Sequence, residues 1–309
     1  MNTLREAATD YIAMRRNLGY KLKPAGIGLS SFVEFMEKKG AAWITTRLAL
    51  EWAQNPAHIQ PSGWAQRLGW VRGFARYRSA MDGRTEIPPS HLLPYRPSRA
   101  NPHLYTQKEI QSLLTAALNI PQAHGLSRFT YYCLFGLLAV SGMRISEVLN
   151  LRVDEVDLEN GVLTINGAKF GKSRLIPLHG STKEVLRDYK LRRDTFLKGR
   201  PSAFFFISRA GNKLLVRIVE AQFLRLSRRI GLRSPKDESG PRIHDFRHCF
   251  AIDTLLRWYR SGKDAEQRLP LLSTYLGHVN VANTYWYLTA CPELLGEAVK
   301  RLERRWEVK

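Results

Sequence analysis

The chain has 309 residues, of which 44% are hydrophobic, and this is enough for about two domains of ordinary size. Its 48 Lys and Arg residues against 27 Asp and Glu residues give a formal charge of +21. This balance is far from that of an ordinary cytosolic enzyme and predicts a polyanionic partner. No run of about 18 apolar residues and no signal-peptide core is present, which argues against a membrane partner. We therefore expect a soluble intracellular protein.

Residues 1–86 are predicted to form a small helical domain, because no strand-like alternation occurs in them. The expected helices are Leu4 to Leu18, Gly28 to Glu37, Thr46 to Ala53 and Gly63 to Met81. The last of them carries Arg67, Arg72, Arg76 and Arg78 among aromatic residues. Helical spacing places the aromatic residues in the core, and we interpret the arginines as solvated or facing DNA phosphates.

Five prolines between Ile87 and Pro102 exclude a helix or a central strand, so we interpret residues 87–103 as an extended, basic linker. A second domain, 104–309, then begins at a helix whose capping box is formed by Thr106 and Glu109. The domain boundary is therefore expected near residue 104.

The second domain is predicted to combine helices with one small sheet. The apolar stretch Thr130 to Val140 is long enough for a buried helix, and Ser181 with Glu184 is expected to cap another helix. Strand-like runs separated by glycine-bearing turns predict a three-stranded antiparallel sheet. These runs are Val153 to Leu158, Val162 to Asn166 and Arg174 to Leu178, with a further short buried strand expected at Ala203 to Ser208. Residues from Ala221 onward are expected to be helical, so the fold class is mainly α with a small antiparallel β-sheet (α+β).

Several pairs of polar residues have helical spacings that would let both side chains contact the same ligand. His244 and Arg247 lie on one face of a predicted helix, and Arg144 lies one helical turn before Glu147. His244 and His248 have the spacing of a zinc-binding pair, but no Glu lies between them and no third ligand is evident. We expect no metal site there. The three cysteines, Cys133, Cys249 and Cys291, match neither a metal pattern nor a disulfide framework, so reduced packing thiols are expected.

Four motifs follow one another along the chain, and their order indicates more than any of them alone. They are SGMRISEVLNL, AKFGKSRLIPL, HDFRH and LGHVNVANTYWY. With them the chain resembles the tyrosine recombinases, also called the phage integrase family. By this resemblance the catalytic residues are Arg144, Lys169, His244, Arg247, His278 and Tyr287. Tyr287 lies nine residues after His278, as the family's nucleophile does, so Tyr285 is interpreted as a packing residue. Lys169 lies eight residues before Pro177, and Lys172 is the alternative lysine and a candidate DNA contact.

Two positions depart from the family's pattern without removing a catalytic group. Ser141 stands where Thr is frequent, and Asn283-Thr284 stands where a Thr pair is common.

The resemblance implies a SAM-like, DNA-binding core-binding domain at 1–86 and a catalytic domain with a helical tail at 104–309. It implies a site-specific recombinase that cuts and rejoins double-stranded DNA through a 3′-phosphotyrosyl intermediate and a Holliday junction, without metal, ATP or other cofactor. Arg144 and Arg247 would neutralise the phosphate, Lys169 would protonate the leaving oxygen, and His244 would help activate Tyr287. His278 would hydrogen-bond the phosphate, and Glu147 would orient Arg144 without being catalytic.

The resemblance further implies a homo-tetramer, or an assembly with related recombinases, in the cytoplasm of a prokaryote at the nucleoid. The apolar stripe of the tail, Leu294, Leu295, Val299 and Leu302, fits packing on a neighbouring subunit or on its own subunit. Two alternatives stay open: a DNA-binding accessory protein that keeps the fold but does not cut, and a type IB topoisomerase, which shares the chemistry but relaxes supercoils without sequence choice. The biological role stays open among prophage integration, transposon movement, integron-cassette exchange and chromosome-dimer resolution. The stretch YIAMRRNLGYKL looks like that of transposon-encoded members, which we take as the expected role.

Overall fold

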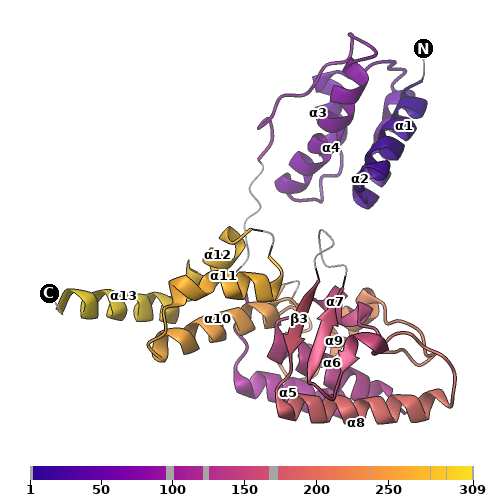
Figure 1. Ribbon diagram of the computed structural model, residues 1–309. Helices are drawn as coiled ribbons and strands as arrows, with labels where there is room; N and C mark the ends of the chain where they lie inside the picture. Colours follow the sequence, from indigo (N-terminus) through magenta and orange to yellow (C-terminus); the bar gives the residue numbers. More distant parts are fainter. Residues whose placement is uncertain are drawn as a thin grey trace. The chain divides into compact units, whose positions relative to one another are not determined.

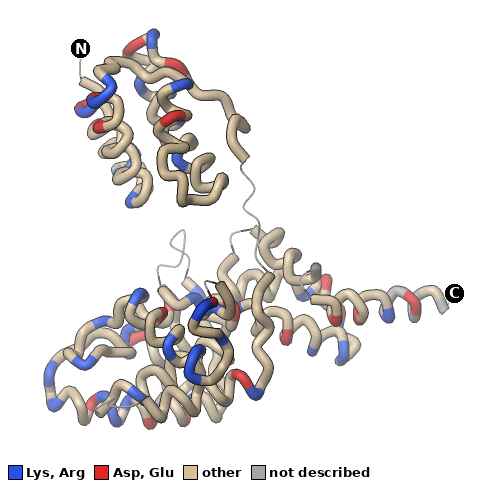
Figure 2. Tube along the Cα trace, turned by 180° about the vertical axis from the view of Figure 1, so that it is seen from behind, with Lys and Arg blue, Asp and Glu red and all other residues tan. Residues whose placement is uncertain are grey.

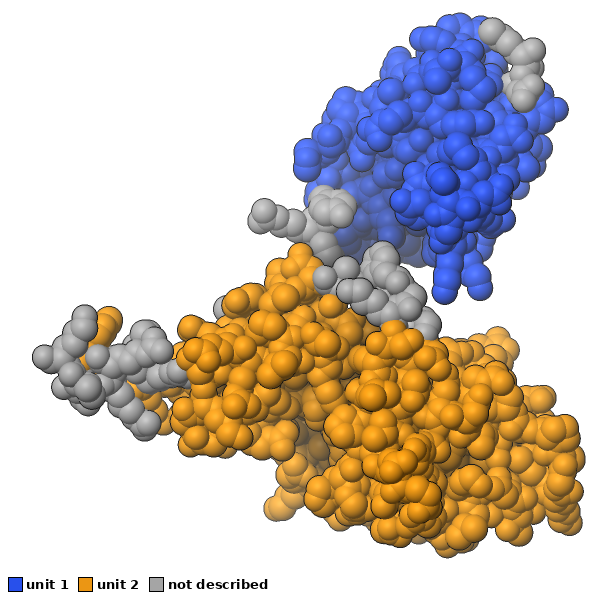
Figure 3. Space-filling model, in the orientation of Figure 1, with its two compact units in different colours: residues 1–100 blue, residues 101–309 orange. Residues whose placement is uncertain are grey.

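The computed structural model describes residues 3–94, 101–120, 125–166, 173–237, 239–278, 280–289 and 291–307. It divides into two compact units, residues 1–100 and 101–309 (Figure 3). The described residues are mostly helical, with one small antiparallel sheet in the second unit (Figure 1), which confirms the predicted fold class. Lys and Arg residues are spread over both units (Figure 2).

In residues 3–94, the first unit packs four helices around one core. They are α1 (Leu4–Asn17), α2 (Lys23–Lys38), α3 (Thr46–Gln54) and α4 (Pro61–Ser79). Phe32, Trp52 and Phe74 are among the fully buried side chains, so aromatic residues do form this core. Helix α2 begins five residues earlier than predicted, with Pro24 in its first turn. Gly28 is a packing position inside α2, because a Cβ there would lie 2.5 Å from the ring of Trp70.

Three of the four arginines of α4 hold the first unit together, which differs from the solvated positions expected for them. Arg67 donates to two carbonyl oxygens near the end of α3 and lies 3.7 Å above the ring centroid of Trp52. Arg72 donates to the carbonyl oxygens of residues 88 and 89. Arg78 is only 4% exposed and lies 3.7 Å from the carboxylate of Asp82. Arg76 is exposed, as predicted.

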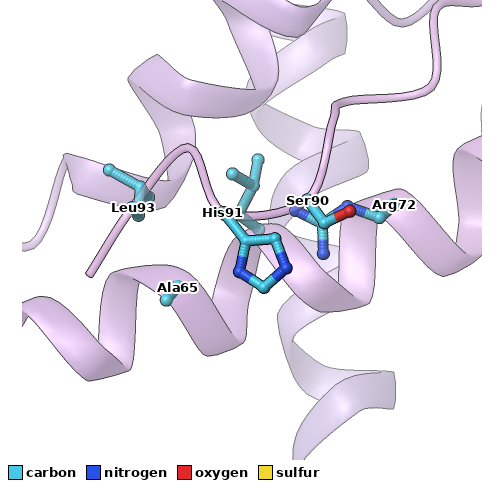
Figure 4. A pocket seen from close by; sticks show the side chains of 6 residues that line it. Ala65, Arg72, Ser90, His91 and Leu93 are labelled. Carbon is cyan, nitrogen blue, oxygen red and sulfur yellow. The ribbon is translucent and has the colours of Figure 1, made fainter. Parts of the chain in front are cut away.

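Part of the proline-rich segment belongs to the first unit. Residues 87–94 lie along α4, where Arg72 binds two of their carbonyl groups. A small, mostly apolar pocket separates this segment from α4 (Figure 4), and it is lined by Ala65, Leu68, Arg72, Ser90, His91 and Leu93. The predicted linker, residues 87–103, thus starts with residues that contact α4, and residues 95–100 lie outside the described part of the chain.

The second unit has two cores. The larger core is enclosed by α5 (Gln107–Leu118), α6 (Ser127–Ser141), α7 (Ile145–Asn150), α8 (Gly180–Leu197), α9 (Val216–Arg229), the sheet and the start of α10 (Asp245–Arg260), which contributes Phe246 and Cys249. The smaller core is formed by α10 (Asp245–Arg260), α11 (Ala265–Leu276), α12 (Ala282–Thr289) and α13 (Pro292–Glu307). The predicted capping box of Thr106 and Glu109 is present at the start of α5 and is confirmed.

The sheet has the order β1-β2-β3 and is antiparallel throughout. Its strands are β1 (Val156–Asp157), β2 (Val162–Ile165) and β3 (Arg174–Pro177). The register pairs Leu163 with Ile176, and both side chains are fully buried in the larger core. The first strand is shorter than predicted, because Val153–Glu155 forms a 3-10 turn in which Glu155 accepts from the Arg152 N–H at 2.8 Å.

Two local predictions in this unit are wrong. Residues 203–208 form no strand and make only isolated pairings, Arg152 with Phe204 and Ile207 with Lys213, although residues 205–207 are buried as expected. Helix α8 is capped by His179, because its Nδ1 accepts from the Ser181 N–H at 3.3 Å. A histidine cap of this kind is not one of the preferred capping residues, which is why the sequence pointed to Ser181.

The tail helix α13 begins on its own unit. Leu294 is 1% exposed in the smaller core, whereas Leu295 and Val299 are about half exposed. These three residues of the predicted apolar stripe are therefore divided between the core and the surface, and the side chain of Leu302 lies outside the described part of the chain. The three cysteines are buried and unpaired, as expected. None of the described helices is long and apolar enough to cross a membrane.

Helix α6 ends at Gly142, which adopts a left-handed backbone with φ of 60°. A Cβ at this position would lie 2.6 Å from the ring of Phe250. We expect Gly142→Ala to lower the free energy of unfolding by about 2 kcal/mol, because it adds backbone strain and a steric overlap. The measurement is urea unfolding of the full chain.

The matched control is Gly136→Ala in the same helix. A Cβ at Gly136 would meet only Leu114, at 3.8 Å, so this change should be neutral or stabilise by up to ~1 kcal/mol. Equal losses in both variants would contradict the argument from the backbone conformation.

Candidate active site

Three arginines from three different elements converge on the C-terminal end of helix α11. Arg174 of β3 donates its Nε–H to the carbonyl oxygen of Tyr275 at 2.7 Å. Arg247 of α10 donates to the carbonyl oxygen of Leu276, and Arg144 donates to that of Gly277 at 2.9 Å. These carbonyl groups have no partner within the helix and carry the negative end of its dipole. The end of α11 is therefore a site that gathers positive charge.

Arg144 is the N-cap residue of α7, where its conformation is fixed by Glu147. The carboxylate of Glu147 accepts from the Arg144 backbone N–H at 2.8 Å and from its guanidinium at 2.8 Å. Arg174 also binds this carboxylate, through both of its terminal nitrogens. Burial alone would raise the pKa of Glu147, but the hydrogen bonds from Arg174 and Arg144 outweigh it and lower the pKa below its usual value. Glu147 thus binds both the backbone and the side chain of Arg144.

Arg247 is the most deeply placed arginine of the site, with 2% of its surface exposed. It bridges two helix ends, because its other terminal nitrogen donates to the carbonyl oxygen of Gly142 at 2.8 Å. Burial, together with the nearby charge of Arg144, lowers the pKa of Arg247 to about 10. The guanidinium remains charged at neutral pH and is desolvated, and these two properties strengthen its binding to an anion.

The predicted nucleophile lies beside this cluster on α12. Tyr287 is 2% exposed, and its ring centroid lies 6.1 Å from that of His278 and 5.5 Å from that of His248. The His248 ring in turn lies 4.8 Å from that of His244. Tyr285, which was interpreted as a packing residue, is 53% exposed, so that interpretation is wrong. The helical rotation between these two tyrosines turns one to the core and the other to solvent.

His278 follows directly after the three carbonyl groups that bind the arginines. Its Nδ1 is 2.8 Å from the hydroxyl of Thr284, which is fully buried in α12. Thr284 therefore orients the ring of His278. Asn283-Thr284 is the pair that departs from the pattern expected by resemblance. Because the contact with His278 is made by Thr284, Asn283 leaves it intact.

All three histidines of the site have lowered pKa values. Burial, followed by the charges of Arg247 and Arg144, lowers the pKa of His278 to about 4. Burial and the neighbouring His244 lower the pKa of His248 to about 4. His244 is solvent-accessible, but partial desolvation and the charge of Arg247 still lower its pKa. The rings are therefore neutral at pH 7 and able to accept a proton from a nearby hydroxyl.

The structure brings together Arg144, Glu147, His244, Arg247, His278 and Tyr287 in one region of the second unit. Lys169 and Lys172 lie outside the described residues. Sequence reasoning missed Arg174, and it considered His248 only as half of a metal pair. The signal for Arg174 was a charged residue entering a strand that is otherwise apolar, and the signal for His248 was its helical spacing from His244.

Comparisons with known proteins identify the family of this chain. Residues 104–293 match the family model described as the phage integrase family. The chain belongs to the phage integrase family. It is 56% identical, over 99% of both chains, to the putative integrase/recombinase y4rB of Sinorhizobium fredii, and 33% identical, over 96% and 95% of the two chains, to y4rE of the same organism. It is 30% identical to the tyrosine recombinase XerD of Caulobacter vibrioides, over 78% of this chain and 75% of that protein.

Solved structures of this family share the fold. The Tn1549 transposon integrase in complex with transposon right end DNA superposes with a TM-score of 0.63 at 15% identity, covering 98% of this chain and 99% of that one. The XerH site-specific recombinase bound to difH substrate in a post-cleavage complex gives a TM-score of 0.64 at 20% identity, covering 90% and 78%. At these identities the likeness shows the fold alone.

The buried carboxylate of Glu147 gives a test of the arginine cluster. Glu147→Gln keeps the shape of the side chain but removes the charge that Arg144 and Arg174 share. Because it leaves the buried charge of Arg174 without a carboxylate partner, we expect a loss of about 3 kcal/mol in the free energy of unfolding, measured in urea.

Glu184→Gln is the matched control, because Glu184 pairs with Arg187 at the same spacing as Glu147 with Arg144 but is 64% exposed. Its loss should stay below about 1 kcal/mol. A similar loss in both variants would mean that Glu147 contributes no more than a surface ion pair.

The lowered histidine pKa values predict how stability depends on pH. In the unfolded chain these rings titrate near pH ~6.5, whereas folded His248 and His278 titrate at about 4. The unfolded state therefore binds more protons between these pH values. Stability should be complete above pH ~6.5 and fall as the pH drops toward 4. NMR titration of the imidazole signals and urea midpoints across this range are the measurements, and titration of either ring near its ordinary pKa would contradict the prediction.

Proposed function

We propose that this protein is a site-specific tyrosine recombinase that cuts and rejoins DNA strands with Tyr287 as its nucleophile. The observation that supports the proposal is the convergence of Arg144 and Arg247 on the end of α11, directly before His278 and next to the ring of Tyr287. A phosphodiester is the substrate that such a set fits, because it is an anion that needs charge neutralisation before a hydroxyl can attack it.

Arg144 and Arg247 bind the nonbridging oxygens of the phosphate in this proposal. Both guanidiniums are held by carbonyl groups before substrate arrives, so little reorganisation is needed when charge builds up in the pentavalent transition state. Two arginines supply here what divalent ions supply in many nucleases, so the proposed reaction requires neither metal nor ATP. His278, held by Thr284, adds a hydrogen bond to the phosphate.

In the cleavage step, Oη of Tyr287 attacks phosphorus and the bond to the 5′ oxygen breaks. The hydroxyl proton passes to a neutral histidine, for which we propose His244, and Lys169 gives a proton to the departing 5′ oxygen. The phosphotyrosyl bond conserves the energy of the diester, so a 5′ hydroxyl of another strand reverses the step and rejoins the DNA. Because Tyr287 is only 2% exposed, α12 has to shift when DNA binds before Oη can reach a phosphate.

Double-stranded DNA is the partner that the charge of +21 fits, and both units contribute basic residues. We propose that the first unit, residues 1–100, is the core-binding domain and that Arg76 is the arginine of α4 that faces DNA, since the other three pack within the unit. By family membership we propose a tetramer on two DNA sites, with a Holliday junction between two strand exchanges.

We place this activity at the nucleoid of a prokaryote and in the movement of a mobile element. The relatives named integrase/recombinase and the fold shared with a transposon integrase support that role.

The first experiment is to trap the covalent intermediate. The protein is incubated in EDTA with fragmented genomic DNA of its source organism and then denatured. Protein–DNA adducts are isolated, and the modified residue is located by mass spectrometry. We expect phosphotyrosine at Tyr287, lost in Tyr287→Phe by at least ~10³-fold because the nucleophile is absent. Tyr285→Phe is the matched control two residues away and should keep the adduct.

Sequencing the attached DNA would then identify the target. An adduct that persists in Tyr287→Phe would overturn the assignment of the nucleophile. Tight DNA binding with no adduct from the wild-type protein would favour an accessory protein that does not cut, and relaxation of a supercoiled plasmid without any preferred site would favour a topoisomerase.

A further inference from the structure

Arg174, the first residue of β3, has contacts that a surface residue of a strand end does not need. Its side chain is 9% exposed, and all three of its nitrogens are hydrogen-bonded. Nε donates to the carbonyl oxygen of Tyr275 at 2.7 Å, and the terminal nitrogens bind the two oxygens of Glu147 at 3.1 and 2.7 Å. This forked geometry is specific to arginine and fixes the carboxylate in one orientation.

Glu147 is therefore shared unequally between two arginines. Arg174 occupies both of its oxygens, whereas the guanidinium of Arg144 makes a single contact with it, at 2.8 Å. The other terminal nitrogen of Arg144 donates to the backbone carbonyl oxygen of Gly277. Because the charge of Arg174 offsets the charge of Glu147, the charge of Arg144 is left over for another anion.

Gly277 makes this close approach of two cations possible. A Cβ at this position would lie 3.0 Å from a terminal nitrogen of Arg174 and 3.5 Å from one of Arg144. Two guanidiniums this close repel each other unless an anion lies between them. Glu147 is that anion, and it is 8% exposed.

We propose that Arg174 is a positioning residue for the phosphate site: it neutralises and orients Glu147, so that Arg144 is held in place by Glu147 without losing its charge to it. Arg174 also fastens the first residue of β3 to the end of α11, directly before His278. This inference rests on the proposed recombinase function, in which Arg144 binds the scissile phosphate, and it assigns Arg174 no contact with DNA.

The test uses Arg174→Lys, with the rate of covalent adduct formation measured in a single turnover at saturating DNA. The DNA is a duplex of the sequence recovered with the trapped protein, with a nick that prevents rejoining. Lysine keeps the charge but cannot bind both oxygens of Glu147, so Arg144 should be misplaced and the rate should fall ~10²-fold. The dissociation constant for the same DNA should change by less than about threefold, because the loss is in the transition state.

Arg193→Lys is the matched control for simple loss of a buried arginine. Arg193 is 4% exposed in the same unit, and it binds the carbonyl oxygens of Ser202 and Phe204 and the carboxylate of Asp194. It lies outside the site, so its replacement should lower thermal stability and leave the rate of adduct formation unchanged. If Arg174→Lys behaves in the same way as Arg193→Lys, Arg174 is structural and the proposal is overturned.

A double variant separates neutralisation from packing. In Arg174→Met, Glu147 has only Arg144 as a cationic partner and neutralises its charge. Both the affinity for DNA and the rate of adduct formation should therefore decrease. Adding Glu147→Gln removes the charge of the carboxylate, and we expect the rate to recover at least ~10-fold relative to Arg174→Met. No recovery would overturn the neutralising role.

The proposal and the function on which it rests fail in different ways. Absence of any adduct from the wild-type protein counts against the recombinase, whatever Arg174 does. In that case a crystal structure of Arg174→Met decides: Arg144 should turn onto both oxygens of Glu147, and an unchanged Arg144 would overturn the proposal.

Discussion

The second unit depends on one interaction, the binding of three guanidinium groups by three consecutive carbonyl groups at the end of α11. The groups come from β3, α7 and α10, so this single turn fixes the positions of a sheet and two helices relative to a third. A helix C-terminus with a glycine in the left-handed conformation leaves these carbonyl groups accessible. The positive cluster is therefore stabilised by the backbone before any anion is present.

The same arrangement explains how a concentrated positive charge is tolerated inside a protein. Arg247 is buried against the ends of α6 and α11, both of which present the negative ends of helix dipoles. Glu147 supplies the one carboxylate that the cluster contains among the described side chains. The pKa values of His278 and His244 are lowered, by burial and by the charges of Arg247 and Arg144, so that these rings remain neutral. A region built in this way attracts an anion and keeps proton acceptors next to it.

The smaller core contains Tyr287, the predicted nucleophile of the site. Tyr287 packs among apolar side chains of α10, α11 and α12, so the predicted nucleophile is also a core residue. The two interpretations considered for a tyrosine at this position, packing and chemistry, are thus not exclusive. For Tyr287 to serve both roles, the short helix α12 has to move without unfolding the larger core. Tyr287 belongs to the smaller core, which is compatible with that movement.

Local patterns were enough to predict much of the molecule. The fold class, the capping box at Thr106, the central helix and the β2–β3 hairpin followed from periodicity and turn residues, because these depend on neighbours in the chain. Predictions failed where a distant residue decides. The arginines of α4 turn inward because the end of α3 and residues 88 and 89 offer carbonyl groups.

The sequence by itself determined which residue types are available and in what order, since the spacing of Arg144, Arg247, His278 and Tyr287 is a property of the chain. Only the tertiary structure decided what each one touches. Arg144 and Gly277 are 133 positions apart, and Arg174 and Tyr275 are 101 positions apart, so no local pattern joins them. The sharing of Glu147, the neutral state of the histidines and the burial of Tyr287 all arise from these long-range contacts, because burial and charge depend on every element packed around a group.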